Sequence, residues 1–324
     1  MKRFFALFTV LFLLANCDDG NIEAASFDFA EAKVASCGSG TANFFIYNAK
    51  DKRTFIIKIA ESNFKNLITP SNNPIVLKID NASNKVIYRE YSDNITSETL
   101  CAAIPVSTPT VSKEWVAVGG NIVIKTTVVK VENTDGSSTI SGYNHSISFE
   151  NIAFETGNGQ QKNDLIEFGK YFTSAVSVVN FTTLQTKNCG TNTFFYKYSS
   201  NQAMSLLANS SLFDTNILGT PKTQFIDNLS NKLVYNIYNP NSGTLTDDYF
   251  CSTTLPVFPT IFENWIADNG ADTNGFISGQ IEVTTASNGV GKFSHTIVLK
   301  NIHFSKGEIG FKLASKYVFG IYND

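Results

Sequence analysis

Short runs of apolar residues, bounded by polar turn residues, extend along most of this chain. Runs such as 43–48, 54–60 and 99–105 are separated by clusters of Asn, Asp, Gly, Ser and Pro. In residues 145–149, His, Ile and Phe alternate with Ser, which is the period of two expected of a strand. The pattern therefore predicts an all-β fold of many short strands joined by polar turns.

A few segments depart from simple alternation. Residues 109–118 and 259–268 each begin with a proline, and we expect one short helix in each half of the chain there. At Asn151 and Asn301 the apolar positions shift by one residue, which predicts a bulge or a break in a strand.

One phrase occurs twice in the sequence. Residues 79–91 read IDNASNKVIYREY and residues 226–238 read IDNLSNKLVYNIY, with eight identities in thirteen positions. Other matched segments keep an offset between 147 and 152 residues, which is the size of a whole domain. The sequence thus predicts two tandem, internally duplicated β-sandwich domains of about 150 residues, 26–173 and 174–324.

The two halves differ most between their matched tryptophan and histidine, an interval of 30 residues in both. Without gaps, 268–275 corresponds to 118–125. Alternatively, 120–127 aligns with 279–285, which moves a nine-residue insertion from one side of a strand to the other. The sequence leaves both alignments open. In either, 268–275 is the most divergent polar segment, and 132–141 is the next.

The N-terminus has the features of an export signal. Lys2 and Arg3 precede an apolar run over 4–14, which is shorter than the roughly 20 residues that a membrane-spanning helix needs. Residues 14–17, Leu-Ala-Asn-Cys, resemble a bacterial lipobox, in which the cysteine is lipidated. This predicts a signal peptide over 1–16 and a lipid anchor at Cys17. The alternative is an ordinary secreted protein.

The remaining cysteines form two matched pairs. Cys37 corresponds to Cys189 and Cys101 to Cys251, so each half holds two cysteines. Because an exported chain enters an oxidising compartment, we expect disulfides Cys37–Cys101 and Cys189–Cys251. Four free buried thiols are the alternative. Cys17 has no counterpart in the second half, and lipidation accounts for this odd cysteine.

A resemblance follows from these features. The lipobox, then Asp-Asp-Gly over 18–20, then a Phe-rich all-β body with paired cysteines resembles flavobacterial and other Bacteroidota lipoproteins of no established activity. The resemblance implies a lipid-anchored protein of the outer membrane or cell surface, with 17–25 as a tether. In enterobacteria, by contrast, an Asp directly after the cysteine would imply retention at the inner membrane.

Charge and motifs narrow the function classes. Residues 17–324 carry 23 cationic and 28 acidic side chains, a formal charge of −5, and no basic patch, which argues against a nucleic-acid partner. The sequence lacks G-x-S-x-G, H-E-x-x-H and a phosphate-binding glycine loop. The matched His145 and His295 are hydrogen-bonded core residues or ligands, and the matched Trp115 and Trp265 are core residues or a sugar-binding platform.

Residues 268–275, DNGADTNG, contain the remaining candidate site. Asp268, Asp272 and Asn274 form part of a calcium-loop pattern, although no Glu stands at its twelfth position. A solvated turn without a metal is the alternative. Because unmatched loops on a rigid scaffold are free to specialise, we expect this segment to lie exposed and to contribute to a ligand or partner contact.

Together these features predict a lipid-anchored, non-enzymatic surface protein that needs no cofactor and binds a glycan, a protein or matrix. Two copies of a module raise avidity, whereas an enzyme needs one intact site. Two alternatives stay open. One is a structural subunit of an envelope assembly, and the other is a hydrolase whose site cannot be recognised from one sequence.

Overall fold

The computed structural model describes residues 27–29, 32–70, 72–157, 159–177, 179–190, 193–254 and 256–324. The predicted signal peptide, the tether and Cys17 lie outside the described residues. Within these ranges the regular structure is nearly all antiparallel β, as the alternating pattern predicts. No helix in the described part of the chain is long and apolar enough to cross a membrane.

The chain folds as two units. Of the described residues, the first unit comprises those up to 127 together with 144–173, and the second comprises 128–143 together with those from 174 to 324. The division at 173 and 174 is where the repeat places its boundary. Residues 128–143 depart from that prediction, because they lie inside the first half of the sequence yet belong to the second unit.

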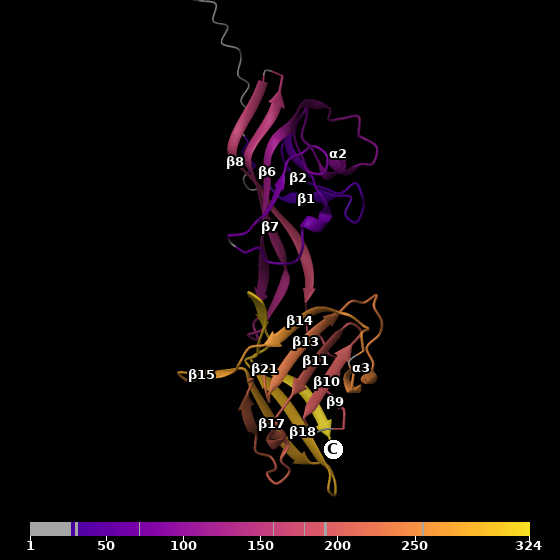
Figure 1. Ribbon diagram of the computed structural model, residues 1–324, viewed down its shortest axis with the longest axis vertical. Helices are drawn as coiled ribbons and strands as arrows, with labels where there is room; N and C mark the ends of the chain where they lie inside the picture. The colour runs from indigo at the N-terminus through magenta and orange to yellow at the C-terminus, as the bar shows by residue number, and fades with distance from the viewer. Residues whose placement is uncertain are drawn as a thin grey trace, which may run out of the picture. The chain divides into compact units, whose positions relative to one another are not determined.

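The first unit contains one eight-stranded sheet with the order β1-β2-β3-β5-β6-β7-β8, in which β4 also pairs with β6 (Figure 1). A 3-10 turn and one short helix accompany the sheet. The elements are β1 (Val34–Cys37), β2 (Phe45–Lys50), β3 (Arg53–Lys58), η1 (Glu61–Asn63), β4 (Ile75–Lys78), β5 (Lys85–Tyr91), α2 (Ser97–Cys101), β6 (Val111–Glu132), β7 (Ser138–Thr156) and β8 (Gly159–Ser177).

The second unit contains a seven-stranded sheet, β20-β19-β14-β13-β11-β10-β9, a four-stranded sheet, β12-β17-β18-β21, and a two-stranded sheet, β15-β16. The elements are β9 (Lys187–Asn188), β10 (Phe194–Ser199), β11 (Gln202–Leu207), η2 (Ser210–Phe213), β12 (Lys222–Phe225), β13 (Lys232–Tyr238), α3 (Asp247–Cys251), β14 (Ile261–Ala267), β15 (Ala271–Thr273), β16 (Phe276–Ser278), β17 (Gln280–Ser287), β18 (Phe293–Lys300), β19 (His303–Lys306), β20 (Ile309–Lys312) and β21 (Lys316–Asn323).

Both units share one strand order. The sheet β9-β10-β11-β13-β14-β19-β20 repeats β1-β2-β3-β5-β6-β7-β8 in sequence order, and β12 pairs with β17 as β4 pairs with β6. Each of the long strands β6, β7 and β8 spans the length that two shorter strands cover in the second unit. The two separate sheets of the second unit fit the predicted β-sandwich.

The predicted helices are wrong. Residues 109–118 enter strand β6 and 259–268 enter strand β14, because Trp115 and Ala117 are buried while their neighbours are more exposed, the alternation of a strand. The short helices are α2 and α3 instead, so a strand over 99–105 is also wrong. Helix α2 begins with a capping box, in which the Thr96 hydroxyl accepts a hydrogen bond from the backbone N–H of Thr99.

The first unit buries an aromatic core that includes a residue before its first strand. The ring centroid of Phe27 lies 5.1 Å from those of both Phe55 and Tyr88, and 6.5 Å from that of Trp115. In the second unit a residue of β20, Phe311, packs 5.1 Å from Trp265. The ring that packs beside the matched tryptophan therefore comes from the segment before β1 in the first unit and from β20 in the second.

The predicted breaks at Asn151 and Asn301 are confirmed, because both residues have positive φ, 51° and 49°. Asn151 lies within β7, whereas Asn301 separates β18 from β19. Asn tolerates this left-handed backbone better than other non-glycine residues. The shift of parity after each Asn follows from this local reversal.

Hydrogen bonds decide between the two alignments of the halves. Gly120 accepts a backbone hydrogen bond from Ile79, and Gly279 accepts one from Ile226, the counterpart of Ile79. Gly279 therefore corresponds to Gly120, and 268–275 lies within an insertion of the second unit. The β6–β7 hairpin is longer than β17–β18 by the same nine residues, which is why its tip, 128–143, extends into the second unit.

Candidate functional site

Each unit has one disulfide that fastens its short helix to an edge strand. Cys37 of β1 is bonded to Cys101 of α2, with Cα atoms 5.4 Å apart. Cys189 is bonded to Cys251 of α3, with Cα atoms 5.2 Å apart. This is the pairing that the sequence predicts. Each bridge holds the loops around the helix against the sheet.

A cavity of ≈ 940 Å³ opens beside the Cys37–Cys101 bridge in the first unit. Its size falls within the roughly 300–1,000 Å³ of small-ligand sites. Four segments that are distant in sequence form its walls: the loop after β1, the end of β3 with η1, the β4–β5 turn and the end of α2. The lining residues are Cys37, Gly38, 41–45, 58–61, 82–83 and 100–103.

The loop over 38–44 is held in place by Glu61. The Ser39 hydroxyl donates a hydrogen bond to one carboxylate oxygen of Glu61, and the Gly40 backbone N–H donates to the other at 2.7 Å. The hydrogen bond from Ser39 and then that from Gly40 lower the pKa of Glu61 below its ordinary value. The wall is therefore fixed before any ligand arrives.

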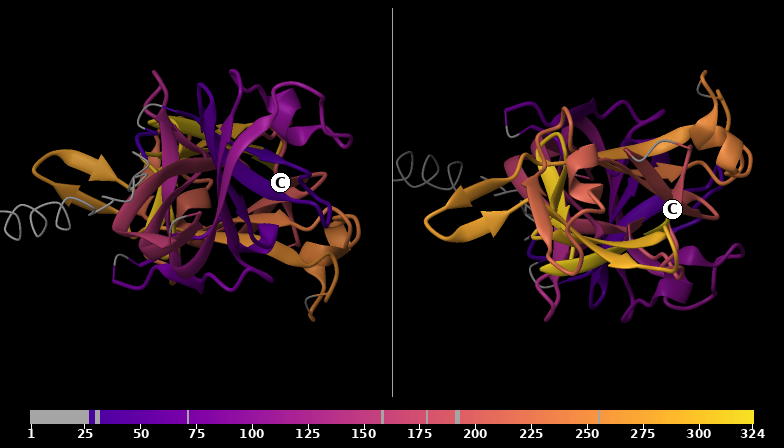
Figure 2. Two further views of the ribbon diagram at one scale, coloured as in Figure 1. Left: turned by 90° about the horizontal axis from the view of Figure 1, so that it is seen from above. Right: turned by 90° about the horizontal axis from the view of Figure 1, so that it is seen from below.

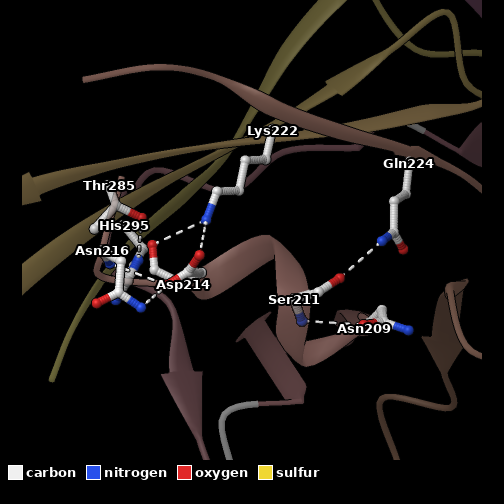
Figure 3. A network of polar contacts seen from close by, with 8 residues as sticks. All are labelled: Asn209, Ser211, Asp214, Asn216, Lys222, Gln224, Thr285 and His295. Carbon is white, nitrogen blue, oxygen red and sulfur yellow. Dashed lines mark hydrogen bonds and ion pairs between the residues drawn. The ribbon is translucent and has the colours of Figure 1, made fainter. Parts of the chain in front are cut away.

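The second unit builds the same region differently. Ser36 pairs with Ile46, ten residues later, whereas Asn188 pairs with Phe195, seven residues later, so the first unit's loop is three residues longer. In the second unit η2 is tied to β12 instead. Figure 3 shows Lys222 bonded to Asp214, with Nζ and Oδ2 3.0 Å apart. Among the described residues, the loop held by Glu61 is thus a feature of the first unit.

Several polar groups on the cavity lining are available to a ligand. In the described part of the chain, the Asn43 carboxamide, the Ser83 hydroxyl and the Lys58 ammonium have no hydrogen-bond or ion-pair partner. Phe45 and Leu100 are partly buried and add apolar surface to the same lining. The cavity combines hydrogen-bonding groups with an apolar floor, which is the composition of a site for a polar organic ligand.

The predicted binding segment forms a hairpin rather than a loop. β15 and β16 pair through the two-residue turn Asn274-Gly275, where φ is 53° and 85°. The hairpin is exposed and projects from the rest of its unit (Figures 1 and 2). At the base of the hairpin the two backbone segments approach closely, because a Cβ on Gly279 would lie 2.7 Å from the Cα of Gly270. The Asn-Gly pair is a strong hairpin signal and could have predicted this element.

Two of the three candidate calcium ligands, Asp272 and Asn274, belong to the turn of this hairpin, and the third, Asp268, contacts a neighbouring strand. Asp268 lies 2.5 Å from His303, measured from Oδ2 to Nδ1, and the Asp272 carboxylate accepts from the N–H of Gly275 at 3.1 Å. Asn274 occupies the turn itself. Among the described residues there is no group of three or more His, Cys, Asp or Glu that could hold a metal ion. Calcium binding here gains no support, and a binding role for the hairpin stays a prediction.

The matched histidines are buried, hydrogen-bonded core residues. His145 Nδ1 lies 2.8 Å from the Thr126 hydroxyl, and its Nε2 lies 2.9 Å from the Thr173 hydroxyl. Burial lowers the pKa of His145 to about 4. In the second unit His295 Nδ1 lies 2.9 Å from the Thr285 hydroxyl (Figure 3). Neither histidine reaches the surface as a ligand would.

The matched tryptophans also belong to the core. Trp115 is 4% exposed and Trp265 is 0% exposed, so neither ring offers a face to a sugar. A lysine ammonium lies over each ring, Lys113 at 5.2 Å and Lys306 at 5.1 Å from the ring centroid. The sugar-platform interpretation of these residues is therefore excluded.

The two units thus differ most where one has a longer segment than the other. The first unit has the longer loop that walls the cavity, and the second has the inserted hairpin. These segments, rather than the shared strands, are the candidates for specific binding. The chain matches no protein-family model, no curated protein and no solved structure.

Proposed function

We propose that this chain is a lipid-anchored, non-enzymatic binding protein of the outer membrane or cell surface, and that its first unit binds a glycan in the cavity beside Cys37–Cys101. The observation that carries the proposal is the longer loop over 38–44, fixed by Glu61 as one wall of a ligand-sized cavity. Binding to a preformed wall avoids the entropic cost of ordering a loop.

The cavity fits a glycan better than a protein partner. A stable protein interface buries about 800 Å² on each side over a broad surface, whereas this site is concave and bounded by four loops. Its lining offers an amide, a hydroxyl and a cation for sugar hydroxyl groups. Phe45 supplies an apolar surface for the carbon face of a ring.

Small side chains on the lining allow a direct test of the site. Ala60 and Ala103 are exposed and line the cavity, so Ala60→Trp and Ala103→Trp obstruct it without disturbing the core. Ala286→Trp, on an exposed position of β17, is the matched control. We expect a glycan array to identify ligands, and both cavity variants to lose binding while the control keeps it.

The same experiment can overturn the proposal. If glycans bind and the two cavity variants bind as the parent does, the ligand lies elsewhere. If no glycan binds and intact cells are equally well recognised by all three variants, the cavity has no binding role.

The anchor is supported by the lipobox and by the disulfides, which use the other four cysteines and leave Cys17 for lipid. Cys17→Ser should release the protein from membranes into the soluble fraction. Unchanged partitioning into detergent, with the signal peptide removed at another position, would contradict lipidation.

A second candidate, a subunit of an envelope assembly, is favoured by exposed apolar residues in the second unit. Val257, Phe258 and Phe262 are 77%, 64% and 72% exposed, and they lie within six residues of one another. If these neighbouring side chains form one apolar patch, it would suit a partner contact. Cross-linking on intact cells that captures a partner through this segment, and fails with Phe258→Ser and Phe262→Ser together, would favour assembly over glycan binding.

A further inference from the structure

Two lysines face each other beside the cavity. The antiparallel register of β3 and β5 places Lys58 directly opposite Lys85. Directly opposite residues share one face of a sheet, with Cβ atoms about 4.5–5.5 Å apart. Ile56 and Ile87 form the next pair on that face, in the small apolar cluster that also contains Cys37. Lys58 lines the cavity, and Lys85, its partner across the two strands, lies next to that lining.

Neither lysine has an acidic partner in the described part of the chain. Other cations of the first unit do, because Lys50 pairs with Asp28, Lys52 with Asp93 and Arg89 with Glu114. The acidic residue on the cavity lining, Glu61, already accepts from Ser39 and Gly40 with both oxygens. Like charges directly opposite each other are destabilising in a sheet, and a bound anion would relieve the repulsion.

We propose that the ligand of this cavity is an anionic saccharide, whose carboxylate or sulfate group binds between Lys58 and Lys85. The hydroxyl groups of the same sugar bind Asn43 and Ser83. The inference rests on the proposed function, since it names the class of ligand for the same site. It also assigns a positive site to a chain whose net charge is negative.

The second unit lacks the lysine pair. Its corresponding strands, β11 and β13, place Leu207 opposite Lys232. A single exposed lysine beside a leucine provides no two-point contact for an anion. Anion binding is therefore specific to the first unit, and Lys232 offers a matched control.

Titration calorimetry on the full chain tests the inference with three probes. An oligogalacturonide carries carboxylates, chondroitin sulfate adds sulfate groups, and a maltooligosaccharide is neutral. We expect binding of one or both anionic probes and none of the neutral one. Because a hydrogen bond to a charged group contributes roughly 1.5–3 kcal/mol, Lys58→Gln and Lys85→Gln should each weaken binding roughly 10-fold to 100-fold. Lys232→Gln should leave the affinity unchanged.

Salt and fold provide two further readouts. Binding should weaken as the salt concentration rises from about 20 to about 500 mM, as expected for exposed charges that ions screen. Both lysines are outside the core and repel each other, so each variant should melt at or slightly above the parent's melting temperature. Comparison of the two anionic probes decides whether carboxylate or sulfate is recognised.

The outcomes separate this inference from the proposed function. If a neutral glycan binds and Ala60→Trp abolishes its binding while Lys58→Gln does not, the cavity binds ligand but the anionic class is wrong. The same conclusion follows if an anionic probe binds with equal affinity to the parent and to the variant that carries both lysine substitutions. If no saccharide binds, both proposals fail.

Discussion

Asn48 and Lys197 occupy corresponding positions in β2 and β10, and each donates a hydrogen bond to the backbone carbonyl of a matched phenylalanine. Asn48 Nδ2 lies 2.5 Å from the oxygen of Phe168, and Lys197 Nζ lies 2.6 Å from that of Phe319. Lys197 is only 3% exposed. One unit thus uses a neutral amide where the other buries a cation.

The Lys197 ammonium lies over three aromatic rings, those of Phe181, Tyr317 and Phe319. Burial lowers the pKa of Lys197 to about 8. Between about pH 8 and the ordinary lysine value near 10.4, the unfolded chain binds a proton that the folded chain does not. Stability should therefore rise with pH in this window, by at most about 3 kcal/mol. Urea unfolding at about pH 7.5, about 9 and about 10 measures this slope, and Lys197→Met should remove it. An equal slope in the variant would assign the effect to other groups.

His145 should make the stability of the protein depend on pH in the acidic range. Its pKa, lowered to about 4 by burial, lies below the ordinary value near 6.5, so the unfolded chain takes up a proton first as the pH falls. The free energy of unfolding of the first unit should fall by up to about 3 kcal/mol as the pH is lowered from about 7 to about 4. Histidine NMR signals report the titration directly. A His145 signal that titrates near pH 6.5 in the folded protein would contradict the prediction.

Glu61→Gln should loosen the cavity wall. The carboxamide introduced by this substitution offers one acceptor oxygen where the carboxylate offers two, so the hydrogen bond from Gly40 or that from Ser39 weakens. We expect faster hydrogen exchange at the Gly40 amide and weaker ligand binding, with little change in melting temperature. Glu98→Gln, in the first turn of α2, is the control. Because the hydrogen bonds from Ser39 and Gly40 lower the pKa of Glu61 below its ordinary value, the parent should keep this contact at more acidic pH than an ordinary glutamate would.

Phe27→Ala should destabilise the first unit by up to about 3 kcal/mol, less than the usual loss for a fully buried ring, because Phe27 is partly buried against the core. Its ring packs against those of Phe55 and Tyr88 although it precedes β1. Phe172→Ala, at a 45% exposed position, should change the unfolding free energy by less than about 1 kcal/mol. Equal effects of the two substitutions would show that Phe27 is not part of the core.

The hairpin prediction can be tested with a variant that keeps the backbone of the turn. Replacement of Asp268 and Asp272 by Ala and of Asn274 by Gly removes three exposed polar side chains, and glycine tolerates the positive φ at position 274. If the hairpin contributes to a partner contact, binding to cells or glycans should fall while the melting temperature stays within about 2 °C, as for surface changes. A triple variant that binds as the parent does leaves the hairpin without this role.

Two kinds of feature could be predicted from the sequence: those that depend on the alternation of apolar and polar residues, and those that depend on residues matched between the two halves. Alternation indicated the strands, and matched cysteines indicated both disulfides. The helix predicted at 109–118 is wrong because a proline can also precede a strand, and the burial around Trp115 alternates as in a strand. Asn274-Gly275 is a hairpin turn signal, but the strands beside it are three residues long and polar residues precede it, which conceals the hairpin.

The cavity could not be predicted from one sequence. Glu61 and Ser39 are 22 residues apart, and only the folded sheet brings them together. The opposition of Lys58 to Lys85 depends on the register of β3 and β5, which the composition of the two strands does not reveal. Lys197 departs from the rule that an inward position in a strand is apolar, and its ring neighbours and its hydrogen bond to the Phe319 carbonyl explain how it is accommodated.

The tip of the β6–β7 hairpin constrains how the protein can be made. Ser138 accepts a hydrogen bond from the N–H of Lys312, 174 residues later, and Asp135 accepts one from Ser315. During synthesis this hairpin leaves the ribosome long before Lys312 and Ser315 do. Ile140 and Tyr143, which are buried in the folded protein, therefore stay exposed to solvent until the second half has been translated. A fragment cut at 173 and 174 would separate the hairpin from its second-half partners permanently. The first half would then expose apolar residues, and the second would lack part of its own interior.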